Sequence, residues 1–76
     1  MTVRDEKIIK DANEKNIPVF VFVAKDKLSY DAICSYYQIC CLSGDCSTEF
    51  LSDLRGRIEE FKQWQEDNKE MVKIPD

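Results

Sequence analysis

The stretch Ile17-Pro18-Val19-Phe20-Val21-Phe22-Val23-Ala24 decides the fold that this sequence predicts. Its valines alternate with phenylalanines and an alanine, so both faces of a strand formed here are apolar. Such a strand needs cover on two faces and hydrogen-bond partners at two edges. We therefore expect the strand, which runs to about Lys25, to determine how the molecule assembles.

Helical patterns flank this strand on both sides. Residues 3–15 carry apolar residues at helical spacing, and two further helices are predicted at about 30–42 and 47–67. Four residues mark the expected helix boundaries: Asn16 and Gly44 at C-terminal ends, and Ser29 and Ser47 as N-caps.

The last helix has the clearest apolar face, because Leu51, Leu54, Ile58 and Phe61 recur at three- and four-residue steps. We expect Leu54, Ile58 and Phe61 to form the centre of the core with Phe20 or Phe22.

The predicted fold class is α/β (α+β), with the order α-β-α-α in one small domain that covers residues 1–76. The tail alternates weakly between apolar and polar residues, so a short C-terminal strand is an open alternative there. The sequence leaves open whether the strand at 17–25 pairs between chains or with residues 71–75.

Size and charge restrict the function classes. A chain of 76 residues buries a limited core, and chains of this size are commonly stabilised by disulfides, a metal or a second subunit. The net charge is −4, with basic residues interspersed among acidic ones, so no nucleic-acid binding is expected. The chain has no signal-peptide pattern and no apolar run long enough to span a bilayer, so a cytoplasmic protein without membrane contact is expected.

Four cysteines are the strongest candidates for chemistry, but their spacing is unsuited to a zinc site. The chain has no histidine and no C-x2-C pair, and Cys34 and Cys41 would lie about 10 Å apart along a helix. We expect Cys40 and Cys41 to be small apolar core residues, and Cys46, before the last helix, to be the most reactive thiol. No catalytic residue, metal or cofactor is predicted.

The order strand, helix, helix from Val19 to Phe61 resembles the ribbon-helix-helix fold of small dimeric repressors, in which two chains pair their strands. That family presents polar or basic strand residues to DNA, whereas both faces are apolar here. The resemblance therefore implies strand-mediated dimerisation more than DNA binding.

Two motifs are similar to those of a group of short, uncharacterised bacterial and phage-borne proteins. They are an A-x-D-x-L turn, Ala24-Lys25-Asp26-Lys27-Leu28, and a WQ…N…VK-x-PD ending over residues 64–76. The resemblance implies a bacterial, intracellular protein and no particular activity.

The predicted function is that of a non-enzymatic interaction or accessory module. It would act as a homo-oligomer, with a dimer as the simplest assembly, and with an unidentified protein partner. The residues expected to mediate self-association are Val19, Phe20, Val21, Phe22 and Val23. The alternative is a ribbon-helix-helix-like DNA-binding regulator, and a thiol or metal enzyme is a weaker third interpretation.

Overall fold

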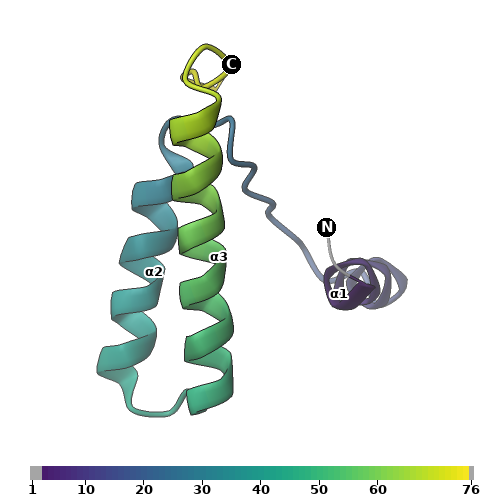
Figure 1. Cartoon of the computed structure of the whole chain (residues 1–76). Coiled ribbons are helices and arrows are strands. Elements are labelled where there is room, and N and C mark those ends of the chain that lie inside the picture. Colours follow the sequence, from purple (N-terminus) through teal and green to yellow (C-terminus); the bar gives the residue numbers. More distant parts are fainter. Residues whose placement is uncertain (1–2, 76) are drawn as a thin grey trace.

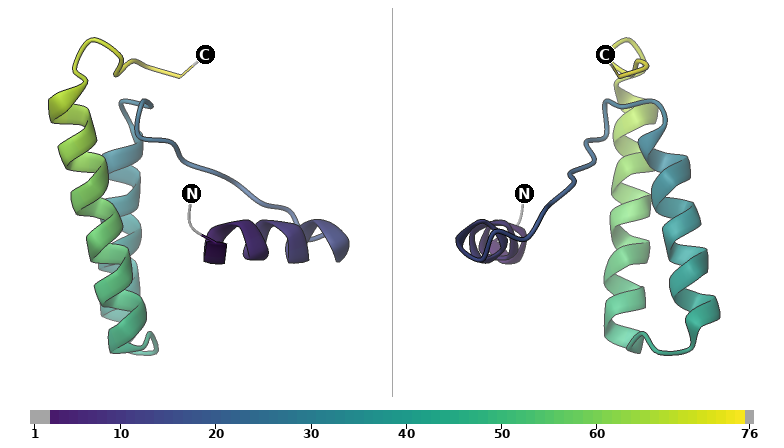
Figure 2. Two further views of the ribbon diagram at one scale, coloured as in Figure 1. Left: turned by 45° about the vertical axis from the view of Figure 1, so that its right-hand side comes forward. Right: turned by 180° about the vertical axis from the view of Figure 1, so that it is seen from behind.

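The computed structural model describes residues 3–75, which form three helices in the order α1 (Val3–Glu14), α2 (Ser29–Ser43) and α3 (Thr48–Asp67). Helices α2 and α3 run side by side in opposite directions and form a helical hairpin, residues 29–67 (Figures 1 and 2). Helix α1 lies apart from the hairpin and crosswise to it. No Cα atom of α1 comes within 8 Å of a Cα atom of α2 or α3.

The predicted α/β fold is wrong: the chain is a small all-α domain, and residues 3–75 contain no β-strand. Residues 17–23, here called the extended segment, run as an irregular stretch between α1 and the turn before α2 (Figure 1). The predicted C-terminal strand is reduced to one isolated parallel bridge between Asp26 and Lys73. The residues of the extended segment favour β structure, but a ladder needs a second strand, which the described part of the chain does not offer.

Local signals place most helix boundaries where the sequence predicted them. Gly44 ends α2 with φ 73°, and Asn16 follows α1 with φ 56°, both in the left-handed region that is common after helices. Ser47 caps α3 by accepting a hydrogen bond from the Phe50 backbone N–H at 3.1 Å. These local interactions fix the ends of the hairpin helices.

Ser29 is not the N-cap of α2, which corrects the prediction. The N-cap position is Leu28, whose N–H donates to Asp26 Oδ1 at 2.8 Å. Ser29 is the first helical residue, and its fully buried hydroxyl donates to the Asp26 carbonyl at 2.7 Å. Asp26 therefore starts the helix through a side-chain turn of the kind that Asp commonly forms.

The core of the chain is small and lies mainly between α2 and α3. Its buried apolar residues are Ile33 and Cys40 from α2, Ile58 from α3 and Ala12 from α1. Ile58 confirms part of the predicted core, whereas Leu54 and Phe61 are only half-buried. The prediction that Phe20 or Phe22 joins this core is wrong, because both side chains are exposed.

The chain exposes much more surface than a compact monomer of its size. Its accessible surface is 6248 Å², whereas a monomer of 8.9 kDa is expected to expose about 4800 Å². Its radius of gyration is 13.7 Å, compared with about 11 Å expected for a compact domain of this length. The separation of α1 from the hairpin, with the extended segment between them, accounts for this open shape.

Candidate self-association surface

The extended segment carries an exposed run of large apolar side chains. Of the predicted self-association residues, Val19 is 45% exposed, Phe20 80%, Val21 53%, Phe22 39% and Val23 52%. The two phenylalanine rings lie close together, with their centroids 4.9 Å apart in an edge-to-face arrangement. The structure thus brings the predicted residues together as one continuous apolar strip, residues 19–23.

The backbone of this strip is also largely unpaired. Within the described part of the chain, no backbone N–H of residues 19–23 donates a hydrogen bond to another residue. The one carbonyl there that accepts a bond is that of Val23, from the Asp26 N–H at 3.1 Å. A stretch with apolar side chains and free backbone groups can accept a pairing strand at its edge.

The C-terminal end of the strip is held to the hairpin by polar contacts. Gln65 of α3 donates from Nε2 to the carbonyls of Ala24, at 2.9 Å, and Asp26, at 3.2 Å. The tail adds two backbone bonds, from the Lys27 N–H to the Lys73 carbonyl at 2.8 Å and from the Lys73 N–H to the Lys25 carbonyl at 3.0 Å. The A-x-D-x-L turn and the WQ…VK ending therefore meet at one junction, which the sequence alone did not predict.

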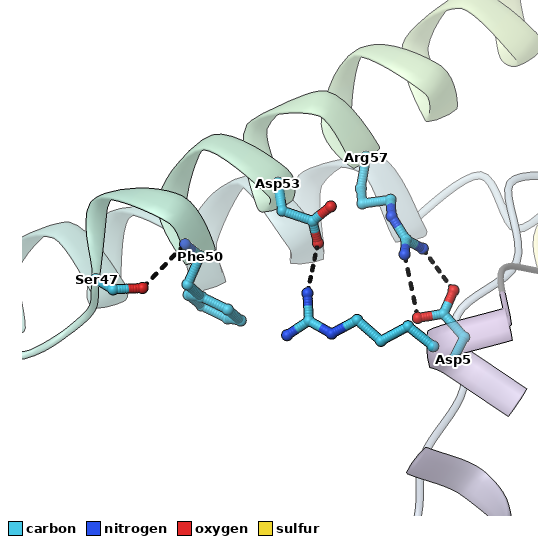
Figure 3. A network of polar contacts seen from close by, with 6 residues as sticks. Asp5, Ser47, Phe50, Asp53 and Arg57 are labelled. Atoms are coloured by element: carbon cyan, nitrogen blue, oxygen red, sulfur yellow. Dashed lines mark hydrogen bonds and ion pairs between the residues drawn. The ribbon is translucent and has the colours of Figure 1, made fainter. Parts of the chain in front are cut away.

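The N-terminal end of the strip is held through α1. The Ile17 N–H donates to the Ala12 carbonyl at 2.8 Å, which joins the extended segment to the end of the helix. Helix α1 is in turn linked to α3 by two ion pairs (Figure 3).

The stronger of these ion pairs joins Asp5 of α1 to Arg57 of α3. Its two parallel hydrogen bonds measure 2.7 Å and 3.1 Å, and both side chains are less than a third exposed. The hydrogen bond with Asp5 raises the pKa of Arg57 further above its ordinary value. The second pair, Arg4 with Asp53 at 3.4 Å, is more exposed and therefore contributes less.

A groove of about 510 Å³ lies between α1, the extended segment and α3. Its walls are mostly apolar and come from all three elements: Ile8 and Ile9 of α1, residues 19–24 and Phe61 of α3. The Asp5–Arg57 pair and Glu60 supply its charged groups. The geometry is that of a surface left uncovered by its own chain.

The cysteines are separated by their environments rather than gathered into a site. Among residues 3–75 no group of three or more potential ligands is placed to hold a metal ion. Cys40 is buried, as predicted, and burial raises the pKa of its thiol. Cys41 is exposed, so the prediction that it belongs to the core is wrong: one residue further along a helix the side chain points about 100° away.

None of the described helices is both long enough and apolar enough to cross a membrane. Comparison of the chain with protein-family models, with curated proteins and with solved structures gave no match. The function of the chain must therefore be inferred from the geometry of its own residues.

Proposed function

We propose that this protein is a small, non-enzymatic interaction module that assembles as a homodimer through residues 19–23. The observation that carries this proposal is the exposed apolar strip on a chain whose surface is unusually large. The excess over a compact monomer is about 1400 Å², more than the roughly 800 Å² that each partner buries in a standard protein interface. Pairing of the strip would remove apolar side chains and free backbone groups from water together.

The tail of the same chain is already bonded elsewhere, so a second chain is the better partner for the strip. Lys73 already pairs with the backbone beside Asp26, beyond the end of the strip, and Ile74 is itself 55% exposed. The tail is therefore engaged at the junction and leaves residues 19–23 open. This favours pairing between chains over pairing with residues 71–75.

The competing function, DNA binding by a paired ribbon, has less support. The strip that would face DNA in a ribbon-helix-helix protein is apolar, and its nearest bases are Lys25 and Lys27 at one end. Two chains would contribute four such charges, against a net charge of −4 on each chain. DNA binding at physiological salt usually needs several cations on one surface.

Light scattering during size-exclusion chromatography measures molar mass and so tests whether residues 19–23 form the dimer interface. Val21→Lys places a charge in the middle of the strip and should yield a folded monomer of 8.9 kDa, while the unchanged chain elutes as a dimer of twice that mass. Ile39→Lys is the matched control, because Ile39 is 63% exposed but lies on the hairpin, away from the strip. It should remain dimeric.

Both variants should keep the helical circular dichroism of the unchanged chain, since neither side chain is buried. A Val21→Lys variant that stays dimeric would refute the proposed surface, and an Ile39→Lys variant that dissociates would place the interface on the hairpin instead.

A further inference from the structure

Resting on the proposed self-association, we infer a particular pairing: the strips of two chains run antiparallel about a two-fold axis at Val21. The sequence of the strip reads the same in both directions, Val19-Phe20-Val21-Phe22-Val23. Antiparallel pairing centred on Val21 therefore places each residue opposite one of the same type. Val19 faces the second chain's Val23, Phe20 faces its Phe22, and Val21 faces its own copy.

The two-fold axis also closes the assembly. An antiparallel pair of identical strands is related by a two-fold rotation, so both chains use the same edge and no unpaired copy of that edge is left. A parallel pair of identical strands is not closed in this way, and its hydrogen bonds are less favourable. A closed dimer thus follows from the antiparallel arrangement.

Pro18 determines which backbone groups take part. Residues of an antiparallel pair alternate between positions that exchange hydrogen bonds and positions that do not. Pro18 has no N–H, and in this register it lies opposite Ala24, whose carbonyl already accepts from Gln65 at 2.9 Å. Pro18 therefore occupies a position that exchanges no backbone hydrogen bonds with the other strand. Val19, Val21 and Val23, which alternate with such positions, are then the residues that exchange them.

One of these bonding groups is shared with a contact inside the chain. The Val23 carbonyl accepts from the Asp26 N–H at 3.1 Å. A carbonyl oxygen has two lone pairs, so it can accept a second bond from the Val19 N–H of the other chain. The turn at Asp26 is therefore compatible with the ladder.

Contacts within the chain limit the length of this ladder. The next bonding pair beyond Val19 and Val23 joins Ile17 of one chain to Lys25 of the other, and one of its two bonds would run from the Ile17 N–H to the Lys25 carbonyl. The Ile17 N–H is already bonded to Ala12, at 2.8 Å, and the Lys25 carbonyl to Lys73, at 3.0 Å. Each end of the ladder therefore loses this bond, because the Ile17 N–H is used inside its own chain. The pairs that keep both of their bonds belong to the palindromic residues.

The same register gathers the four phenylalanines of the dimer on one face. Phe20 and the second chain's Phe22 occupy positions without exchange, where the strands approach most closely and side chains make their best cross-strand contacts. Within each chain the rings of Phe20 and Phe22 already lie edge to face at 4.9 Å. The valines form the opposite face.

Charge substitutions can identify this register because Phe20 and Phe22 are both exposed in the single chain. Phe20→Lys and Phe22→Glu should each weaken the dimer. Mixed in equal amounts, they should form a heterodimer in which the introduced ammonium and carboxylate groups face each other and the two remaining phenylalanines form the other cross-strand pair. We expect the heterodimer to bind about tenfold more tightly than either homodimer, measured by native mass spectrometry and sedimentation of the mixture.

The matched control mixes Phe20→Lys with Phe20→Glu, which opposes the two charges only if the strands are parallel and in register. In the antiparallel register the two positions 20 are only diagonal neighbours, about 7–8 Å apart, so a much weaker preference is predicted in this mixture than in the first. A preference here that equals or exceeds that of the first mixture, or none in the first mixture, would overturn the register even if the unchanged chain is a dimer. A monomeric unchanged chain would instead refute the proposed function on which the register rests.

Discussion

The hairpin and the extended segment use apolar residues in opposite ways. In the hairpin, Ile33 and Cys40 of α2 and Ile58 of α3 are buried between two antiparallel helices. In the extended segment, Phe20 and its neighbours are as apolar as the hairpin residues, yet they face solvent. A helix satisfies its backbone within a few residues of sequence, whereas a strand depends on a distant segment or on another chain.

The two regions also differ in how they are attached. Helix α3 meets α2 through packed side chains, but α1 and the extended segment meet the hairpin mainly through polar contacts, such as Asp5 with Arg57 and Gln65 with Ala24. Ion pairs weaken as salt is added, whereas apolar packing is not screened. The attachment of α1 and the extended segment should therefore weaken with added salt more than the packing of the hairpin does.

The largest expected effect comes from removing the hairpin's packing. Ile58→Ala should lower the free energy of unfolding by about 2–5 kcal/mol, because it deletes a buried side chain and leaves a cavity. Ile39→Ala, at a 63% exposed position, should change it by less than about 0.5 kcal/mol. Urea denaturation at one fixed protein concentration measures both, and equal effects would contradict the assignment of the core.

The two glycines of the hairpin should respond in opposite ways to replacement by alanine. Gly56 lies inside α3 with open space where a Cβ would be added, so Gly56→Ala should stabilise the fold by about 1 kcal/mol. Gly44 has φ 73°, so Gly44→Ala should destabilise it by about 1–2 kcal/mol. Thermal unfolding should show shifts of opposite sign; a loss of stability in Gly56→Ala would mean that another chain packs closely against α3.

The smallest effect concerns the attachment of α1. A double-mutant cycle of Asp5→Ala and Arg57→Ala should give a coupling free energy of about 1 kcal/mol, because the pair is bidentate and mostly shielded. The more exposed Arg4–Asp53 pair should give a coupling free energy of only about 0.3 kcal/mol in its own cycle. Denaturation with and without about 1 M salt checks both, since salt should reduce the coupling. If the two coupling free energies were equal and did not change with added salt, packing rather than charge would hold α1 to α3.

These contrasts explain which features the sequence could predict. Ser47 acts through a hydrogen bond to Phe50, and Gly44 and Asn16 act through their own left-handed backbone conformations, so their residue types were sufficient to place helix ends. Ile58 followed from helical periodicity, which also separates buried Cys40 from exposed Cys41 once the packed face is known.

The remainder depended on distant partners. The strand prediction rested on residues with β preference, but it placed them in a sheet that the described chain does not form. The two links from Gln65 to the turn at Ala24 and Asp26 join residues about 40 positions apart, and a glutamine on a helix gives no local sign of such a role. Long-range pairing is the information that periodicity and capping preferences lack.

The central claim is that the extended segment is completed by a second copy of the chain. Sedimentation equilibrium of the unchanged protein at micromolar concentration tests it most directly, because the method gives mass without reference to shape. The account predicts a mass close to twice 8.9 kDa that falls toward 8.9 kDa on dilution or with Val21→Lys. A mass of 8.9 kDa at every concentration would contradict it, and the strip would then be open in the isolated protein.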